Sequence, residues 1–254
     1  RLLRFFAARA LEKMYKRTIR GRLWLIIRPV VPLLVATLIF GSVLGIQTGI
    51  PDPLFFITGM TCWSLFSKAL LWATRSLELN RKVLTRLYFP RLILPVSMTA
   101  PAWLEVFFFL AFMIGTGVYY SLRDGTAYFL WSPRLLVAPI ALLLSALFAL
   151  GIGLWTSVLG AGARDVRFTL AYVMDAWLYF TPVIYPISFV PERWQWLLAL
   201  NPMATLVEAF KWATLGTGRL DLSSVAISLG IIAATFAGGL RYFNRAEAAS
   251  IDRL

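Results

Sequence analysis

The longest stretch of the chain without a charged residue runs for 29 residues, from Leu135 to Ala163. An apolar helix of about 20 residues is long enough to cross the hydrocarbon core of a bilayer. Hydrophobic residues make up 59% of the 254 residues and charged residues 15%, which is more apolar surface than a soluble fold can bury. The sequence therefore predicts an all-α integral membrane protein.

Six stretches have the length and composition of membrane-crossing helices. They are residues 24–46, 54–74, 98–120, 135–163, 168–189 and 222–240. We divide the chain into an N-terminal segment, residues 1–22, and a six-span domain, residues 23–254. Six crossings place both termini on the same side of the membrane. The chain begins with Arg rather than Met, so we expect further residues before it in the full protein.

Positive charge is distributed unevenly between the two sides of these spans. Of the 25 Lys and Arg residues, nineteen flank the spans on the side of the termini and five on the other side. Cytoplasmic loops carry such an excess, so we expect both termini in the cytoplasm. A net charge of +13 would indicate a nucleic-acid partner in a soluble chain. In a membrane chain it indicates contact with anionic lipid, and no nucleic acid is expected.

The first 22 residues have the pattern of an amphipathic helix. Its apolar side is formed by Leu3, Phe6, Ala7, Ala10, Leu11 and Met14, and its opposite side is mainly basic. Such a helix lies in the membrane interface, with its apolar side against the lipid. The pattern fits a simple basic anchor and a collar around a pore entrance equally well.

Residues 190–217, on the outer side, are apolar and aromatic but are interrupted by Asn201-Pro202, which ends a helix. Two helices of about ten residues each are too short to span the bilayer. We expect a re-entrant pair that dips into the outer leaflet and forms a lid. Its gate residues would be Trp194, Trp196, Asn201 and Pro202.

Several kinds of chemistry are missing from the sequence. The phosphate-binding pattern GxxxxGK[ST] does not occur, so this chain alone is expected to hydrolyse no ATP. The chain has no His and one Cys, Cys62, which excludes the usual nucleophilic triads, an internal disulfide and a Cys-rich metal site. We expect neither a catalytic residue nor a metal, and a membrane enzyme becomes the weaker alternative.

Aromatic residues make up 15% of the chain and gather near the ends of the spans. Belts of Trp and Tyr are typical of membrane interfaces, and a stripe at helical spacing is most often packing. The alternative is that some rings line a channel and stack on sugar rings. For that role we single out Trp63, Phe66, Trp72 and Tyr185.

Several ordered motifs carry a family resemblance. Residues 15–45 read YKRTIRGRLWLIIRPVVPLLVATLIFGSVLG, residues 76–97 read SLELNRKVLTRLYFPRLILPVS, and Ala163-Arg164-Asp165-Val166 and NPMATLVEAFKWATLG follow. Together they resemble the transmembrane subunit of type-2 ABC exporters for polysaccharides and polyol phosphates. That family includes permeases for O-antigen, capsule and teichoic acid.

The resemblance implies a homodimer in a bacterial inner membrane, with two separate nucleotide-binding ATPase subunits that carry the ATP and Mg. It implies a cytoplasmic coupling helix between the second and third spans, which would dock on the ATPase. The coupling residues would be Asn80, Arg81, Lys82, Thr85, Arg86, Tyr88 and Phe89, with Arg164 and Asp165 as a second contact.

For the substrate, the resemblance implies a glycan on an undecaprenyl-type lipid that enters beside the N-terminal helix. Its pyrophosphate would be attracted by Arg17, Arg20, Arg22 and Arg28. The runner-up is a type-2 ABC permease for teichoic acid, capsule, a drug or a small lipid. A secondary transporter is disfavoured because no inverted repeat is visible in the sequence.

Overall fold

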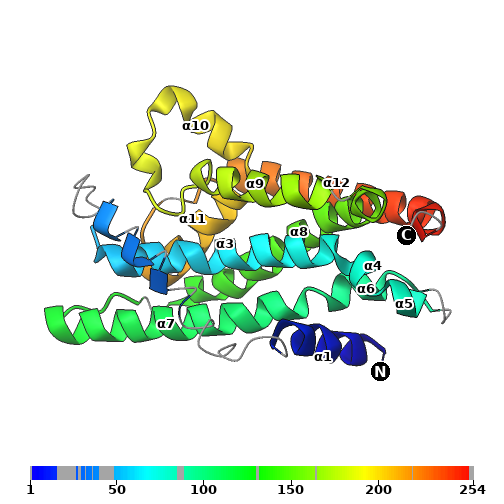
Figure 1. Ribbon diagram of the computed structural model, residues 1–254. Coiled ribbons are helices and arrows are strands. Elements are labelled where there is room, and N and C mark those ends of the chain that lie inside the picture. The colour runs from blue at the N-terminus through cyan, green and yellow to red at the C-terminus, as the bar shows by residue number, and fades with distance from the viewer. Residues whose placement is uncertain are drawn as a thin grey trace.

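The computed structural model describes residues 2–15, 49–84, 89–129, 132–163, 165–218 and 220–251, and nine positions between 27 and 39. Within these ranges every regular element is a helix (Figure 1). The all-α part of the prediction is therefore confirmed for these residues. The predicted first span, residues 24–46, lies mostly outside the described residues.

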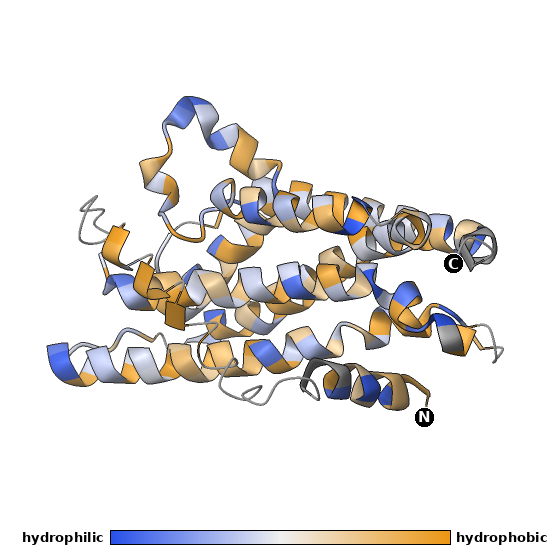
Figure 2. Ribbon diagram, in the orientation of Figure 1, coloured by the Kyte–Doolittle hydropathy of each residue, from blue (hydrophilic) through white to orange (hydrophobic). Residues whose placement is uncertain are grey.

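Four helices in the described part of the chain are long and apolar enough to cross a membrane. The first is α3 (Asp52–Thr74). The second combines α6 (Ile93–Ser97) with α7 (Ala100–Asp124), and the third joins the 3₁₀ turn η2 (Pro133–Leu136) to α8 (Val137–Gly162). The fourth belongs to α12 (Leu222–Ile251). Figure 2 shows apolar residues along these helices, as expected of surfaces that meet lipid or another subunit.

The core forms where α8 packs between α3 and α12. Glycines allow the backbone of α8 to approach α3 and α12 closely. A Cβ added at Gly153 would lie 2.6 Å from the Cβ of Ala73 in α3, and one added at Gly239 of α12 would lie 2.4 Å from the carbonyl oxygen of Gly151. Small residues that let helix backbones meet in this way are typical of membrane helix packing.

The predicted fifth span, residues 168–189, is helical only in its first part. The helix α9 (Asp165–Tyr179) has 15 residues, about 22 Å at 1.5 Å per residue, and ends ten residues before the predicted boundary. Turns follow, and then the short 3₁₀ helix η3 (Ile187–Phe189). Pro182 and Pro186 explain the difference, because a proline disfavours helical geometry at the residue before it.

The long helices separate two groups of shorter ones (Figure 1). The α1 end carries α1 (Leu2–Tyr15), α4 (Ser76–Leu79), α5 (Arg81–Leu84) and α6, next to the C-terminal part of α12. Toward the other end, the α10 end, lie α10 (Glu192–Ala199), α11 (Pro202–Leu215) and the start of α3. The first and last described helices therefore share one end of the molecule.

Candidate functional site

At the α1 end, an apolar cluster joins α1 to the segment after α3. Phe6 of α1 is 2% exposed and stacks on Phe89, with ring centroids 5.2 Å apart and planes 26° apart. The cluster consists of Phe6, Leu77, Leu84, Phe89, Leu94, Leu154, Val158 and Phe243. The short helices are thus attached through their apolar sides, and charged residues such as Arg81 remain exposed.

An ion pair joins the two segments that the sequence assigns to coupling. Arg167, near the start of α9, contacts the carboxylate of Glu78 in α4 through its Nη1. The two side chains are 17% and 36% exposed, so the pair is partly screened from water. It holds α4 against α9, two elements 89 residues apart in the chain.

The predicted coupling residues fall into three groups. Asn80 is buried at the junction of α4 and α5, where its Nδ2 donates to the carbonyl oxygen of Ser76 at 2.9 Å. Arg81 and Asp165 are exposed, and Lys82 belongs to α5. Outside the described residues lie Thr85, Arg86, Tyr88 and Arg164. Phe89 is buried against Phe6, so it stabilises this segment from within, and its coupling role stays a prediction.

The four arginines predicted to attract lipid phosphate also fall outside the described residues. They are Arg17, Arg20, Arg22 and Arg28. Just before them, α1 buries Phe6 and Ala10 and exposes Leu2, Leu3 and Phe5. Its apolar residues therefore contact the rest of the chain on one side and remain uncovered on another.

Two of the predicted channel aromatics lie in the core of the subunit. Trp63 is 5% exposed and Phe66 is fully buried, stacked on Phe148 at 5.3 Å and edge-on to Trp177 at 5.3 Å. Packing inside one subunit covers both rings, and the channel role of these two residues stays a prediction. Trp72 is half-buried.

At the α10 end, Asn201 joins the break between α10 and α11 to the end of α9. Its Oδ1 accepts from the backbone N–H of Met203 at 3.1 Å, which caps α11, and from Trp177 Nε1 at 3.2 Å. Its Nδ2 donates to the carbonyl oxygen of Phe180 at 3.2 Å and to Thr181 Oγ1 at 3.1 Å. The side chain at the predicted helix break thus has hydrogen-bond partners at the end of α9 and at the start of α11. Pro202 is the first residue of α11.

About two turns further along α11, a buried ion pair lies inside the subunit. Lys211 is fully buried, and its Nζ donates to the carbonyl oxygen of Pro182 at 2.6 Å. The same Nζ lies 3.8 Å from Glu208 Oε1 and 3.6 Å from the ring centroid of Phe55. A carbonyl, a carboxylate and an aromatic face therefore surround one ammonium group, which compensates for its removal from water.

The backbone around this pair leaves no spare room. A Cβ added at Gly59 of α3 would lie 2.6 Å from the carbonyl oxygen of Val183 and 3.1 Å from Lys211 Cε. Only a glycine lets α3 approach the 182–183 turn this closely without a shift. This position therefore fixes the turn against α3.

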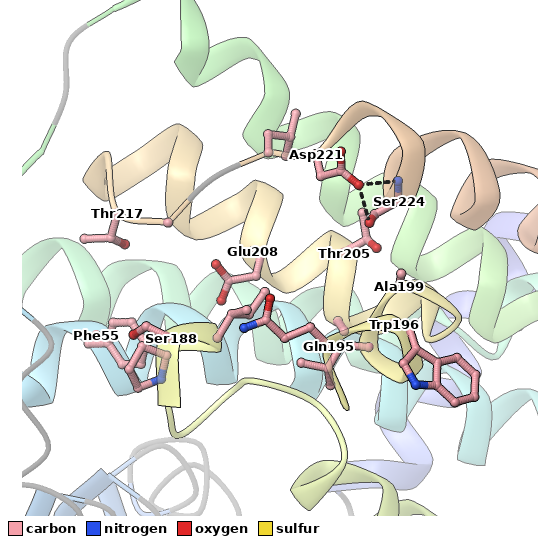
Figure 3. A pocket seen from close by; sticks show the side chains of 16 residues that line it. Phe55, Ser188, Gln195, Trp196, Ala199, Thr205, Glu208, Thr217, Asp221 and Ser224 are labelled. Atoms are coloured by element: carbon pink, nitrogen blue, oxygen red, sulfur yellow. Dashed lines mark hydrogen bonds between the residues drawn. The ribbon is translucent and has the colours of Figure 1, made fainter. Parts of the chain in front are cut away.

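Beside the ion pair is a cavity of about 810 Å³ between α10, α11, η3 and the start of α12 (Figure 3). Glu208 of α11 and Gln195 of α10 reach into it from opposite walls, and Ser188, Thr205, Thr217 and Trp196 also line it. The other predicted gate residue, Trp194, is exposed on α10 and does not line it. Tyr185 lies nearby, half-buried, and its hydroxyl donates to the carbonyl oxygen of Tyr179 at 3.0 Å.

Asp221 closes the cavity where α12 begins. Its carboxylate accepts from the Ser224 backbone N–H at 2.9 Å, from Ser224 Oγ at 2.7 Å and from the Ser223 hydroxyl. Hydrogen bonds from Ser223 and Ser224 lower the pKa of Asp221 to about 2. This carboxylate is thus ionised at neutral pH and is used to cap the helix.

Sequence reasoning missed Glu208, Lys211, Glu78 and Arg167. A signal for the first two was present, because opposite charges three residues apart in an otherwise apolar helix lie on one face. The Glu78–Arg167 pair had no local signal. No group of three or more His, Cys, Asp or Glu that could hold a metal occurs in the described ranges.

Four apolar helices in the described part of the chain are long enough to span a membrane, and shorter helices lie at both ends of the molecule. Together they define a multi-pass helical membrane protein. The chain belongs to the ABC-2 type transporter family, which matches residues 1–215, and it is a membrane permease subunit of that type.

Three relatives agree with this assignment. The O-antigen export system permease protein RfbA of Klebsiella pneumoniae is 26% identical over 239 residues, which cover 92% of this chain and 88% of the relative. The protein of the same name from Myxococcus xanthus is 26% identical and covers 83% of this chain and 78% of the relative. A second Klebsiella pneumoniae protein of that name is 24% identical, with the same coverage as the first.

Proposed function

We propose that this chain is the membrane-spanning subunit of an ATP-driven exporter that moves a lipid-linked polysaccharide, O-antigen on undecaprenyl pyrophosphate, out of the cytoplasm. The observation that carries the proposal is the ABC-2 type match over residues 1–215. Relatives named as O-antigen export permeases, aligned over 92% of this chain, indicate the substrate.

The proposed complex contains two copies of this chain in the inner membrane and two ATPase subunits that bind ATP and Mg. Each copy has six spans and both termini in the cytoplasm. Support comes from the charge asymmetry of the sequence and from the position of α1 beside the end of α12 (Figure 1).

The α1 end is the proposed site of coupling to the ATPase. Exposed charged residues lie over an apolar cluster there, and the Glu78–Arg167 pair joins the segment around α4 and α5 to the start of α9. A push on one segment would therefore reach both α3 and α9. The arginines at 17, 20, 22 and 28 are proposed to receive the lipid pyrophosphate, and α10 and α11 to form a re-entrant outer gate.

The coupling assignment has its own test. Arg86→Ala with Tyr88→Ala is expected to abolish transport and transport-linked ATP hydrolysis, because Arg and aromatic residues anchor interfaces. Lys68→Ala, in the half-buried middle of α3, is the control for loss of a positive charge. Unchanged transport and hydrolysis in the double variant would make the assignment wrong.

Deletion of the gene in its host tests the transport function itself. Loss of surface polysaccharide with accumulation of lipid-linked polymer inside the cell is the expected result, and a plasmid copy restores export. Unchanged surface polysaccharide would overturn the proposal. Loss of teichoic acid or capsule instead would favour another branch of the same class, in which the fold is shared and the cargo differs.

A further inference from the structure

The cavity at the α10 end contains polar atoms without hydrogen-bond partners. The Glu208 side chain is 8% exposed and is directed into the cavity, and its Oε1 receives no hydrogen bond from any described residue. Thr217 Oγ1, also on the wall, is buried without a partner within the same ranges. Buried polar atoms without hydrogen bonds are costly. Both atoms are covered, and Glu208 Oε1 lies 3.8 Å from Lys211 Nζ, so a polar guest would supply their hydrogen bonds once the two side chains turn toward the cavity.

The wall chemistry defines what that guest donates and accepts. A carboxylate oxygen accepts hydrogen bonds, the Gln195 amide both donates and accepts, and the hydroxyls of Ser188 and Thr205 do both. Phe55 and Trp196 add aromatic surface. Adjacent hydroxyl groups on an apolar ring face would satisfy this combination, and that is the chemistry of a sugar.

Other guests fit the walls less well. An anion such as a phosphate would meet the carboxylates of Glu208 and Asp221 on the same cavity. A hydrocarbon chain would offer no hydrogen bond to the Glu208 carboxylate or to the Thr217 hydroxyl. The volume of about 810 Å³ lies in the range of small-molecule sites, large enough for a few sugar rings.

We propose that this cavity, between α10, α11, η3 and the start of α12, is a saccharide-binding subsite within the subunit. Glu208, Gln195 and Thr217 form hydrogen bonds to sugar hydroxyls, and Trp196 contacts a ring at the rim. The inference rests on the proposed function, since it takes the exported polysaccharide as the guest. It adds a place where a segment of the polymer is bound in transit.

Lys211 acts on this subsite through Glu208. Its Nζ, held by the Pro182 carbonyl oxygen, lies 3.8 Å from Oε1, and Lys211 itself does not line the cavity. The ammonium group stabilises the carboxylate as an anion, the stronger hydrogen-bond acceptor. Lys211 is thus a positioning residue, and we assign it no contact with the sugar.

A fluorescent reporter beside the cavity tests the proposal. Phe189→Cys places a thiol next to Ser188 on an exposed position, and the single native Cys62 is fully buried, so labelling is selective. The probe ligand is the repeating-unit oligosaccharide cut from the host's surface polysaccharide. It is titrated into the purified complex with its ATPase, and a polyethylene glycol of equal mass serves as a control solute.

We expect the fluorescence to change saturably with the oligosaccharide and to stay unchanged with polyethylene glycol. Glu208→Gln is expected to weaken the affinity for the oligosaccharide roughly tenfold, because a charged hydrogen-bond acceptor is replaced by a neutral one. Glu192→Gln, the same change on exposed α10 outside the cavity, is expected to leave the affinity unchanged. Ser188→Trp fills the cavity from an exposed position without touching the buried pair, and it is expected to abolish the signal.

No saturable change in the labelled protein, or equal affinities in the wild type, Glu208→Gln and Ser188→Trp proteins, would overturn the subsite. The deletion experiment separates the two proposals. Export that depends on the gene, with no oligosaccharide signal, removes the subsite and leaves the function standing. Export that persists without the gene removes the function.

Discussion

The two ends of the subunit are stabilised in opposite ways. At the α1 end, short helices are attached by an apolar cluster around Phe6 and Phe89, and their charged groups lie outside. At the α10 end, polar groups make the connections: half-buried Asn201 is hydrogen-bonded to the end of α9 and to the start of α11, and Lys211 is fully buried.

The difference has a mechanical meaning. Apolar contacts are non-directional, so an attached segment can shift slightly and keep most of its stabilisation. Buried hydrogen bonds and charges depend on geometry, and losing one partner leaves the other unpaired. We therefore expect the α1 end to tolerate movement and the α10 end to hold one arrangement or switch as a unit.

Lys211→Met is expected to have the largest effect. It leaves the Glu208 carboxylate buried without a cation and the Pro182 carbonyl oxygen without its donor, at a cost of about 4 kcal/mol in free energy of unfolding. Thermal unfolding of the purified complex measures the cost. The double variant Lys211→Met with Glu208→Gln is expected to recover part of it. Wild-type stability in the single variant would show that the pair is unimportant.

Phe6→Ala is expected to come next. Phe6 is 2% exposed and its neighbour Phe5 is 60% exposed, so the same substitution can be compared at adjacent positions. Truncating a buried Phe costs about 3 kcal/mol, and truncating an exposed one costs below about 0.5 kcal/mol. Proteolysis of α1 in the two variants reports its attachment. Equal resistance of α1 to proteolysis in the two variants would mean that the apolar cluster does not hold α1.

Asn201 tests whether the α10 end acts as a unit. Asn201→Ala removes the cap on α11 and leaves Trp177 Nε1 without an acceptor, which is expected to cost about 2 kcal/mol. Asn201→Asp keeps both acceptor contacts and loses the donation to Phe180 and Thr181, so its loss of stability is expected to be smaller. If the two variants unfold at the same temperature, the hydrogen bonds that Asn201 donates to Phe180 and Thr181 account for most of the loss of stability.

The Glu78–Arg167 pair is expected to have the smallest effect on stability. A partly exposed ion pair contributes below about 1 kcal/mol, so Glu78→Gln should barely change the unfolding temperature. It should nevertheless reduce transport-linked ATP hydrolysis, because α4 is released from α9. Glu78→Arg combined with Arg167→Glu is expected to restore the rate. Full hydrolysis in the single variant would show that the pair plays no part in coupling.

Some of this arrangement could be predicted from the sequence and some could not. The break at Asn201-Pro202 has a local cause, since proline starts α11, and it was predicted. The end of α9 at Tyr179 was missed because residues 180–189 are apolar and read as more helix, although Pro182 and Pro186 were visible.

The site was harder to predict because its partners are far apart in the chain. Helical spacing placed Trp63 and Phe66 on one face, but only the structure shows that Phe148 and Trp177 pack against Phe66. Lys211 finds its acceptor at Pro182, 29 residues away. Such contacts follow from the tertiary packing of α3, α9 and α11, and no local pattern encodes them.

Transport in a purified system tests directly whether this chain exports a lipid-linked polysaccharide. The complex of this chain with its ATPase is placed in proteoliposomes with lipid-linked polysaccharide on the ATPase side, and a glycan-cleaving enzyme inside reports arrival. Cleavage is expected to require ATP, Mg and both subunits, and to fall when the ATPase is inactivated. Cleavage without ATP, or none with the complete and active complex, would contradict it.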